Sequence, residues 1–503
     1  MEPIRRREFL KSAAALGAAQ ANTQRPNILF LMADQFRYDC VGVNGNSIVR
    51  TPNLDRLAAQ SANFSHAFVQ APVCVPSRVS CFTGRYPHSH KNRVNYTPCN
   101  SSEVFLQRML KDAGYRTGSV GKLHLYPPTA EQAHTTGFDR ALMHDGVGAT
   151  DPYSDYVKWR KAHDPQAGTP YTALAKPIES GKNPFRGAIP YEFSPTHWTG
   201  QETCKMLREY AAGAQPFFLY SSFFKPHSPF DTPPPYDAMF DGVEIPLPRR
   251  TSLEEIQRLP PPLQKLILRS RTPEYTIPPE RLQWMYRSYY GAIAMVDYEI
   301  GQILAELERS GRSRETIVIF STDHGAQLLE HGLMDKNVFF EASVHVPLLL
   351  RYPGDRASGR RDEMVEMVDL LPTLLELCGI PVPKQVQGRS FAQPGPGREW
   401  VFSENIIPEI ITGGALDMAF VPGKGVAGIR HPDAKMVRSR RWKLNYYPGY
   451  TGELYDLEND PHEERNLIND PAHGATAAEL RAAILDWMIT ADENDQIAER
   501  WLV

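Results

Sequence analysis

Residue types that bind metals or transfer protons follow four apolar runs of the sequence. Asn27–Ala33 is the clearest run, and a continuous apolar run predicts a strand that is buried on both faces. The polar groups that follow the runs are Asp34-Gln35, Lys122-Leu123-His124, His227 and Asp323-His324. In an open parallel sheet, ligands bind just beyond the carboxyl ends of the strands. We therefore expect these side chains to meet at one edge of a sheet and to form a metal or acid–base site.

A cysteine opens a second motif, Cys74-Val75-Pro76-Ser77-Arg78, which Thr83-Gly84-Arg85 follows. Most unpaired cysteines are buried thiols that only fill space. Five specified residue types with a Gly-Arg pair at a fixed distance rarely coincide, so the motif favours a chemical role for Cys74.

This motif resembles the maturation signature of the type I sulfatases, the formylglycine-dependent branch of the alkaline phosphatase superfamily. The resemblance extends from about Pro26 to beyond Leu467. It implies that a separate maturation enzyme oxidises Cys74 to formylglycine, whose hydrated aldehyde attacks the sulfur of a sulfate monoester. A serine would remain sulfated, whereas a geminal diol can release sulfate by losing a second proton and reforming the aldehyde.

The resemblance also implies one divalent metal ion, bound by Asp34, Gln35, the residue at Cys74, Asp323 and His324. Oxygen ligands suit a hard cation, so Ca²⁺ is expected. Many sulfatases have Asp and Asn where this chain has Gln35 and His324, which leaves Mn²⁺ or Zn²⁺ as alternatives. Either aspartate alone would also suit a helix N-cap after a strand.

Five further positions match catalytic residues of the family. Lys122 and Lys336 resemble the two lysines that hold sulfate oxygens. His124 resembles the base that deprotonates the hemiacetal hydroxyl, and His227 resembles the general acid near the leaving oxygen. Arg78 lies one helical turn beyond Cys74, so we expect its guanidinium to reach back to the diol or the sulfate.

Two rival functions follow from the same residues. The Asp-Gln and Asp-His pairs also resemble choline sulfatases and phosphonate monoester hydrolases, so a phosphonate or phosphate monoester hydrolase is the alternative enzyme. An inactive carbohydrate-binding relative would be expected to lack Cys74, Arg78 or an aspartate, and none of these is missing.

The substrate is predicted from two long segments. Residues 140–200 are rich in glycine, proline and tyrosine with little periodicity, and residues 226–281 carry several proline clusters. They are either inert surface loops or walls of the substrate pocket. Tyr153, Tyr156 and Trp159 could stack on a sugar or could anchor their own loop to the domain. A sulfated carbohydrate or an aryl sulfate is the expected substrate.

Strands that alternate with amphipathic helices predict an α/β fold with a large, mainly parallel sheet between helices. Leu54 to Ala62 is predicted to be helical, and Ser102 is predicted to cap a helix that ends at Asp112. After about Pro381, two strands around Pro448-Gly449 and a helix resemble the small antiparallel C-terminal subdomain of sulfatases. The expected domains are residues 25–380 and 381–503.

The N-terminus carries Arg6-Arg7 and a short, weakly apolar stretch, which resembles a twin-arginine export signal that ends near Ala21. This segment is too short to span a bilayer, so a periplasmic or secreted enzyme without stable membrane insertion is expected. A net charge of −3 argues against nucleic-acid binding. The six cysteines form no CxxC motif, and any disulfide pairing stays open.

Overall fold

The computed structural model describes residues 25–95, 97–145, 153–164, 185–187, 189–268, 277–354, 358–406 and 433–492. The predicted export signal lies outside these ranges. Within them, no helix combines the length and the apolar character that crossing a bilayer requires. All six cysteines are free thiols.

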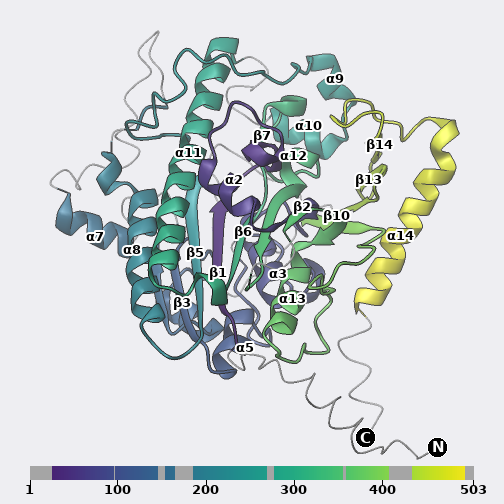
Figure 1. Ribbon diagram of the computed structural model, residues 1–503. Coiled ribbons are helices and arrows are strands. Elements are labelled where there is room, and N and C mark those ends of the chain that lie inside the picture. The colour runs from purple at the N-terminus through teal and green to yellow at the C-terminus, as the bar shows by residue number, and fades with distance from the viewer. Residues whose placement is uncertain are drawn as a thin grey trace, which may run out of the picture.

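An eight-stranded sheet with the order β10-β2-β9-β6-β1-β5-β3-β4 passes through the centre of the molecule (Figure 1). Only β9 is antiparallel to its neighbours; the other adjacent pairs are parallel. Every residue of β1 is buried, as its continuous apolar run predicts. The strands are β1 Asn27–Asp34, β2 Ala62–Phe68, β3 Arg116–Gly121, β4 Arg140–Met143, β5 Phe217–Pro226, β6 Thr316–Thr322, β9 His345–Arg351 and β10 Gly359–Glu366.

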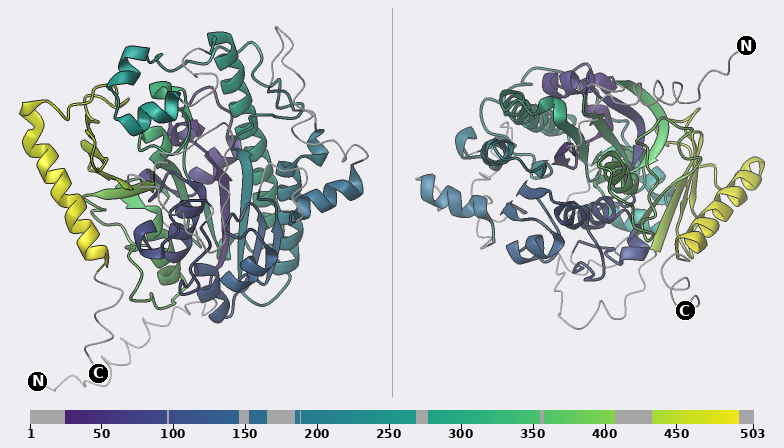
Figure 2. Two further views of the ribbon diagram at one scale, coloured as in Figure 1. Left: turned by 180° about the vertical axis from the view of Figure 1, so that it is seen from behind. Right: turned by 60° about the horizontal axis from the view of Figure 1, so that its bottom comes forward.

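Helices cover both faces of this sheet, as the two views in Figure 2 show. Alternate residues of β1 point to opposite faces, so Phe30 and Leu31 belong to different hydrophobic clusters. The cluster of Phe30 includes residues of α3 (Cys74–Thr83), α5 (Leu106–Asp112) and α13 (Leu370–Leu377). The cluster of Leu31 includes residues of α2 (Pro52–Ala58), α8 (Pro195–Ala211) and α11 (Pro279–Arg309). The predicted α/β architecture is confirmed.

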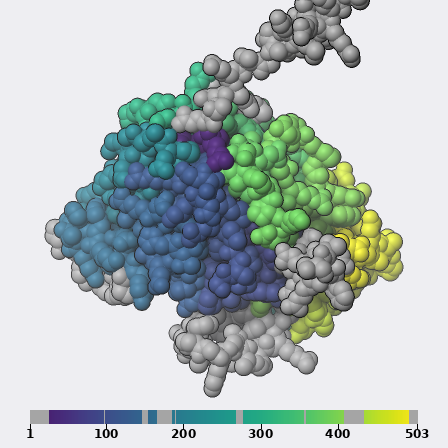
Figure 3. Space-filling model, turned by 90° about the horizontal axis from the view of Figure 1, so that it is seen from below, coloured from purple at the N-terminus to yellow at the C-terminus, as the bar shows by residue number. Residues whose placement is uncertain are grey.

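The C-terminal part forms a four-stranded antiparallel sheet with one long helix against it. Leu444 and Leu454 of the sheet pack with Leu480 and Trp487 of the helix. Figure 3 shows the yellow C-terminal residues at one side of the molecule. The elements are β11 Val401–Ile406, β12 Asp433–Arg438, β13 Trp442–Tyr446, β14 Glu453–Asp456 and α14 Gly474–Asp492. The domain boundary near residue 380 stays a prediction.

Two local predictions were wrong. Ala62 is not helical, because α2 ends at Ala58 and Ala62 begins β2, where it pairs with β9 and β10. Ser102 does not cap a helix, because its N–H donates to the Asn100 side chain in a turn. The helix α5 begins at Leu106, four residues later.

The two long segments, residues 140–200 and 226–281, contain the starts of three helices capped by serine. Ser154, Ser194 and Ser252 accept hydrogen bonds from the first turns of their helices, so local capping replaces the missing apolar periodicity. These helices are α7 Asp155–His163, α8, whose N-cap is Ser194, and α9 Leu253–Arg258, which α10 Pro261–Leu268 follows. The other short elements are α4 Pro87–His90, α6 Ala130–Thr136, β7 Gln327–Leu328, β8 Met334–Asp335 and α12 Glu341–Val344.

Candidate active site

The polar residues that follow four neighbouring strands lie at one edge of the large sheet. The strands β6, β1, β5 and β3 are adjacent and parallel, so their carboxyl ends coincide. Asp34 is the last residue of β1, and Lys122 directly follows β3. His227 directly follows β5, and Asp323 directly follows β6. Sheet topology thus brings together residues that are up to about 290 positions apart in the chain.

Cys74 lies at the centre of this group, as the first residue of α3. Its Sγ is 3.2 Å from His324 Nε2 and 3.0 Å from Lys336 Nζ. Lys336 Nζ is also 2.9 Å from His227 Nε2, so one ammonium contacts the sulfur and the imidazole. Burial raises the pKa of the Cys74 thiol, but Lys336, Lys122 and His324 outweigh burial and hold that pKa well below its usual value. The cysteine therefore lies in a strongly cationic environment.

A potential metal-binding group surrounds this sulfur. One ligand atom from each of Asp34, Cys74, Asp323 and His324 lies within 4.8 Å of the others, and all four residues are buried. Asp34 Oδ1 and both polar atoms of the Gln35 carboxamide are buried without a hydrogen-bond partner. Such unpartnered oxygens are costly unless another group satisfies them. The residues present therefore fit a bound cation.

Arg78 binds the aspartates of this group. Its Nε donates to Asp323 Oδ2 at 2.9 Å, and its Nη2 donates to Asp34 Oδ2 at 3.2 Å. Its Nη1 donates to the Lys122 carbonyl, to Tyr220 Oη and to Ser222 Oγ. The side chain is fully buried, so the guanidinium is directed at the carboxylates and the sheet. Within the described part of the chain, none of its hydrogen bonds or ion pairs reaches Cys74, the direction expected from the sequence.

Lys122 and His124 are held by different carboxylates. Lys122 Nζ forms an ion pair with Asp34 Oδ2 and is almost completely buried. His124 has a positive φ of 49°, and its backbone N–H donates to Asp145 Oδ1 at 2.8 Å. Burial and the charge of Lys122 lower the pKa of His124, which favours the neutral ring. A neutral imidazole next to Cys74 can accept a proton.

Sequence reasoning missed several residues that shape the site. Asp145 comes two residues after β4, so the strand-end rule that selected Asp34 could have selected it as well. Asn95 accepts a hydrogen bond from the backbone N–H of Val75, in the first turn of α3. No local pattern marks Asn95 or Tyr220, because their contacts depend on the tertiary fold.

Tyr153, Tyr156 and Trp159, in the segment 140–200, were expected either to stack on a sugar or to anchor their loop, and they do not all behave alike. Tyr156 is 1% exposed and donates to the Phe193 carbonyl, and Trp159 stacks on Tyr156. These two rings anchor α7 to the domain. Tyr153 is 56% exposed, so its ring remains accessible at the surface.

A sequence model of the sulfatase family matches residues 26–380. An arylsulfatase of Clostridium perfringens is 30% identical over 491 residues, with 92% of this chain and 94% of the relative covered. The chain belongs to the sulfatase family. A choline-sulfatase of Rhizobium meliloti is 27% identical, with 96% of this chain and 91% of the relative covered. A phosphonate monoester hydrolase of Agrobacterium radiobacter shares the fold, with a TM-score of 0.78, 24% identity and coverage of 93% and 96%.

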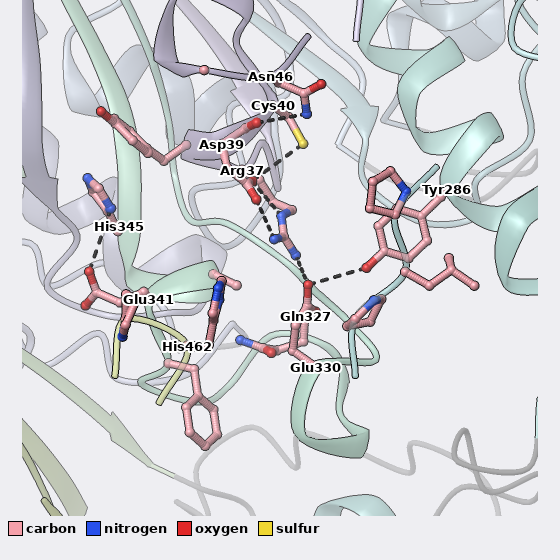
Figure 4. A pocket seen from close by; sticks show the side chains of 18 of the residues that line it. Arg37, Asp39, Cys40, Asn46, Tyr286, Gln327, Glu330, Glu341, His345 and His462 are labelled. Atoms are coloured by element: carbon pink, nitrogen blue, oxygen red, sulfur yellow. Dashed lines mark hydrogen bonds and ion pairs between the residues drawn. The ribbon is translucent and has the colours of Figure 1, made fainter. Parts of the chain in front are cut away.

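This sulfatase also has a cavity of about 560 Å³ that contains none of the predicted site residues (Figure 4). Among the described residues that line it, Arg37 is the one arginine or lysine, and it is paired with Asp39 and Glu330. Figure 4 also shows Glu341 next to His345, which lines the cavity too. Among its described lining residues, the cavity thus offers an anionic ester no lysine and no arginine outside an ion pair.

Proposed function

We propose that this sulfatase hydrolyses a sulfate monoester by means of a formylglycine formed from Cys74. The observation that carries the proposal is the position of Cys74, at the start of α3 between Lys336, His324 and two buried carboxylates. The sulfur marks where the oxygens of the hydrated aldehyde would lie. A maturation enzyme would have to oxidise the residue, since the chain itself supplies a thiol.

The same proposal assigns one divalent cation to Asp34, Gln35, Asp323, His324 and the residue at position 74. A bound cation would favour ionisation of the formylglycine hydroxyl and would offset the charge of an anionic ester. Carboxylate and amide oxygens support Ca²⁺, and the imidazole of His324 keeps Mn²⁺ as the alternative. The unpartnered Asp34 Oδ1 and Gln35 Oε1 support this ligand set.

The cationic side chains position the ester for attack. Lys336 contacts the sulfur of Cys74 and the ring of His227, so its ammonium would hold a sulfate oxygen between the nucleophile and the leaving group. His227 Nδ1 lies 2.6 Å from the Ser228 carbonyl, which fixes the ring with Nε2 toward Lys336. We assign His227 as the general acid that protonates the leaving oxygen. We assign His124 as the base that removes the second formylglycine proton and so releases sulfate.

A sulfated carbohydrate or an aryl sulfate is the proposed substrate. The relative named arylsulfatase supports the aryl ester, and the exposed Tyr153 could contact a sugar ring. A phosphonate monoester hydrolase with the same residues is the second candidate, because of the shared fold and the Asp34-Gln35 pair. We further propose export through the Arg6-Arg7 signal to the periplasm or the medium.

Two experiments test the proposal. In the first, the enzyme is produced together with a formylglycine-generating maturation enzyme, and the mass of the tryptic peptide that contains Cys74 is measured by mass spectrometry. A mass that corresponds to an aldehyde in place of the thiol is expected; a peptide with only cysteine in active enzyme would refute the mechanism.

The second experiment compares kcat/KM for an aryl sulfate, sulfated saccharides, choline sulfate and a phosphonate monoester. The sulfate ester of a phenol or of a sugar should give the highest kcat/KM. A lead of the phosphonate or the choline ester by more than about tenfold, or ~1.4 kcal/mol at the transition state, would overturn the substrate assignment.

A further inference from the structure

The turn that follows β1 contains a residue in an unfavourable backbone conformation. Gln35 has a φ of 63° and is completely buried. Residues that carry a Cβ rarely adopt this left-handed region, and glycine is its usual occupant. The turn lies inside the proposed metal site, directly after Asp34. The surrounding structure must therefore hold Gln35 in place.

Two hydroxyl groups and one carboxylate supply the contacts of this turn. Tyr289 Oη donates to the Gln35 carbonyl at 2.7 Å and accepts from the Arg37 N–H at 3.2 Å. Thr322 Oγ1 accepts from the Phe36 N–H at 3.1 Å. The Gln35 N–H donates to Asp323 Oδ1 at 3.1 Å, which ties the turn to a proposed metal ligand. Tyr289 is thus the one side chain among these that bridges both ends of the turn.

Tyr289 is itself rigidly held. It belongs to the 31-residue helix α11, is completely buried, and packs edge-on against Phe230 with ring centroids 5.7 Å apart. Burial raises the pKa of its phenol well above the usual value, so the hydroxyl keeps its proton and can donate. Removing it would leave a buried carbonyl and a buried N–H without partners.

We propose that Tyr289 is a positioning residue for the metal site, because its hydroxyl holds Gln35 in the left-handed conformation that sets the direction of the Gln35 carboxamide. This inference rests on the proposed metal site. Without the hydroxyl, Gln35 relaxes toward a negative φ. The carboxamide then turns away, and the hydrogen bond between Gln35 N–H and Asp323 Oδ1 is strained.

The test measures Ca²⁺ binding by isothermal titration calorimetry in the matured, metal-stripped full-length enzyme. Tyr289→Phe should raise the Ca²⁺ dissociation constant at least tenfold. Tyr290→Phe is the matched control, because Tyr290 is the next residue of α11, is buried, and accepts a hydrogen bond from Asn46. The control should stay within twofold of the wild type. Equal affinities for wild type and Tyr289→Phe, or equal losses in both variants, would overturn the inference.

A second pair of variants keeps the test decisive if Tyr289→Phe does not fold. Thr322→Val removes the acceptor of the Phe36 N–H at nearly constant volume, whereas Thr322→Ser keeps the hydroxyl. The valine variant should lose at least fivefold in Ca²⁺ affinity relative to the serine variant; equal affinities would contradict the inference that the hydrogen bonds of this turn hold Gln35 for metal binding. A wild-type enzyme that is active but binds no divalent cation would instead refute the proposed metal site itself.

Discussion

Replacing Arg78 by lysine should strongly destabilise the enzyme although the charge is conserved. The three guanidinium nitrogens donate five hydrogen bonds, to two aspartates, a backbone carbonyl, a tyrosine and a serine. A lysine ammonium has three protons on one atom, so at least two of these buried acceptors lose their donor. A charge-assisted hydrogen bond contributes about 1.5–3 kcal/mol. The free energy of unfolding should therefore fall by about 3–6 kcal/mol.

The measurement is urea unfolding at pH 7 in the presence of a chelator, followed by tryptophan fluorescence. Arg160→Lys is the matched control, because Arg160 is also buried and pairs with Asp164 one helical turn away. A lysine can keep that pair, so the control should lose about 1 kcal/mol or less. Losses that differ by less than 1 kcal/mol between the two variants would show that the fork geometry of Arg78 contributes little.

Three further predictions concern other side chains. His227→Ala should lower kcat/KM for a sulfated alkyl alcohol by about 10²–10⁴ and for an activated aryl sulfate far less; equal losses would exclude general-acid catalysis. Asp145→Ala should reduce kcat roughly 10–100-fold because it frees the His124 turn, and Asp145→Asn, which keeps an acceptor oxygen, should restore most of it; an asparagine variant as slow as the alanine variant would exclude this role. Burial lowers the pKa of His90 to about 3. As the pH falls below about 6.5, His90 is protonated in the unfolded chain but stays neutral in the folded chain, so the free energy of unfolding decreases. His90→Gln should reduce the loss in unfolding free energy between pH 7 and pH 5 by about 2 kcal/mol, measured by urea unfolding; an unchanged loss would place the acid sensitivity elsewhere.

The sequence predicts the sheet well where a strand is buried on both faces. The apolar run from Asn27 extends over all of β1, and the rule that polar residues gather beyond parallel strand ends selects Asp34, Lys122 and Asp323. The sequence does not predict β2, because its start at Ala62 continues the helical spacing of α2. Its pairing with β9 and β10 decides the conformation, and both partners lie almost 300 residues away.

The sequence predicts which residues belong to the candidate site, but it does not predict which of their atoms contact one another. Helical spacing correctly places Arg78 one turn beyond Cys74, yet spacing says nothing about the acceptors that compete for the guanidinium. The guanidinium pairs with Asp34 and Asp323 because both carboxylates are buried and fixed at the ends of β1 and β6. The proposed role of Tyr289 depends likewise on packing that no local pattern records.

Charge balance explains why the cations are arranged in this way. Asp34 and Asp323 are fully buried, and two carboxylates so close together would repel each other and favour protonation. Burial raises the pKa of Asp34, but Lys122, His227 and Lys336 outweigh burial and the Cys74 charge and hold that pKa well below its usual value. Lys122, His227 and Lys336 thus favour the ionised form of Asp34. Lys336 also contacts the sulfur of Cys74, the proposed nucleophile.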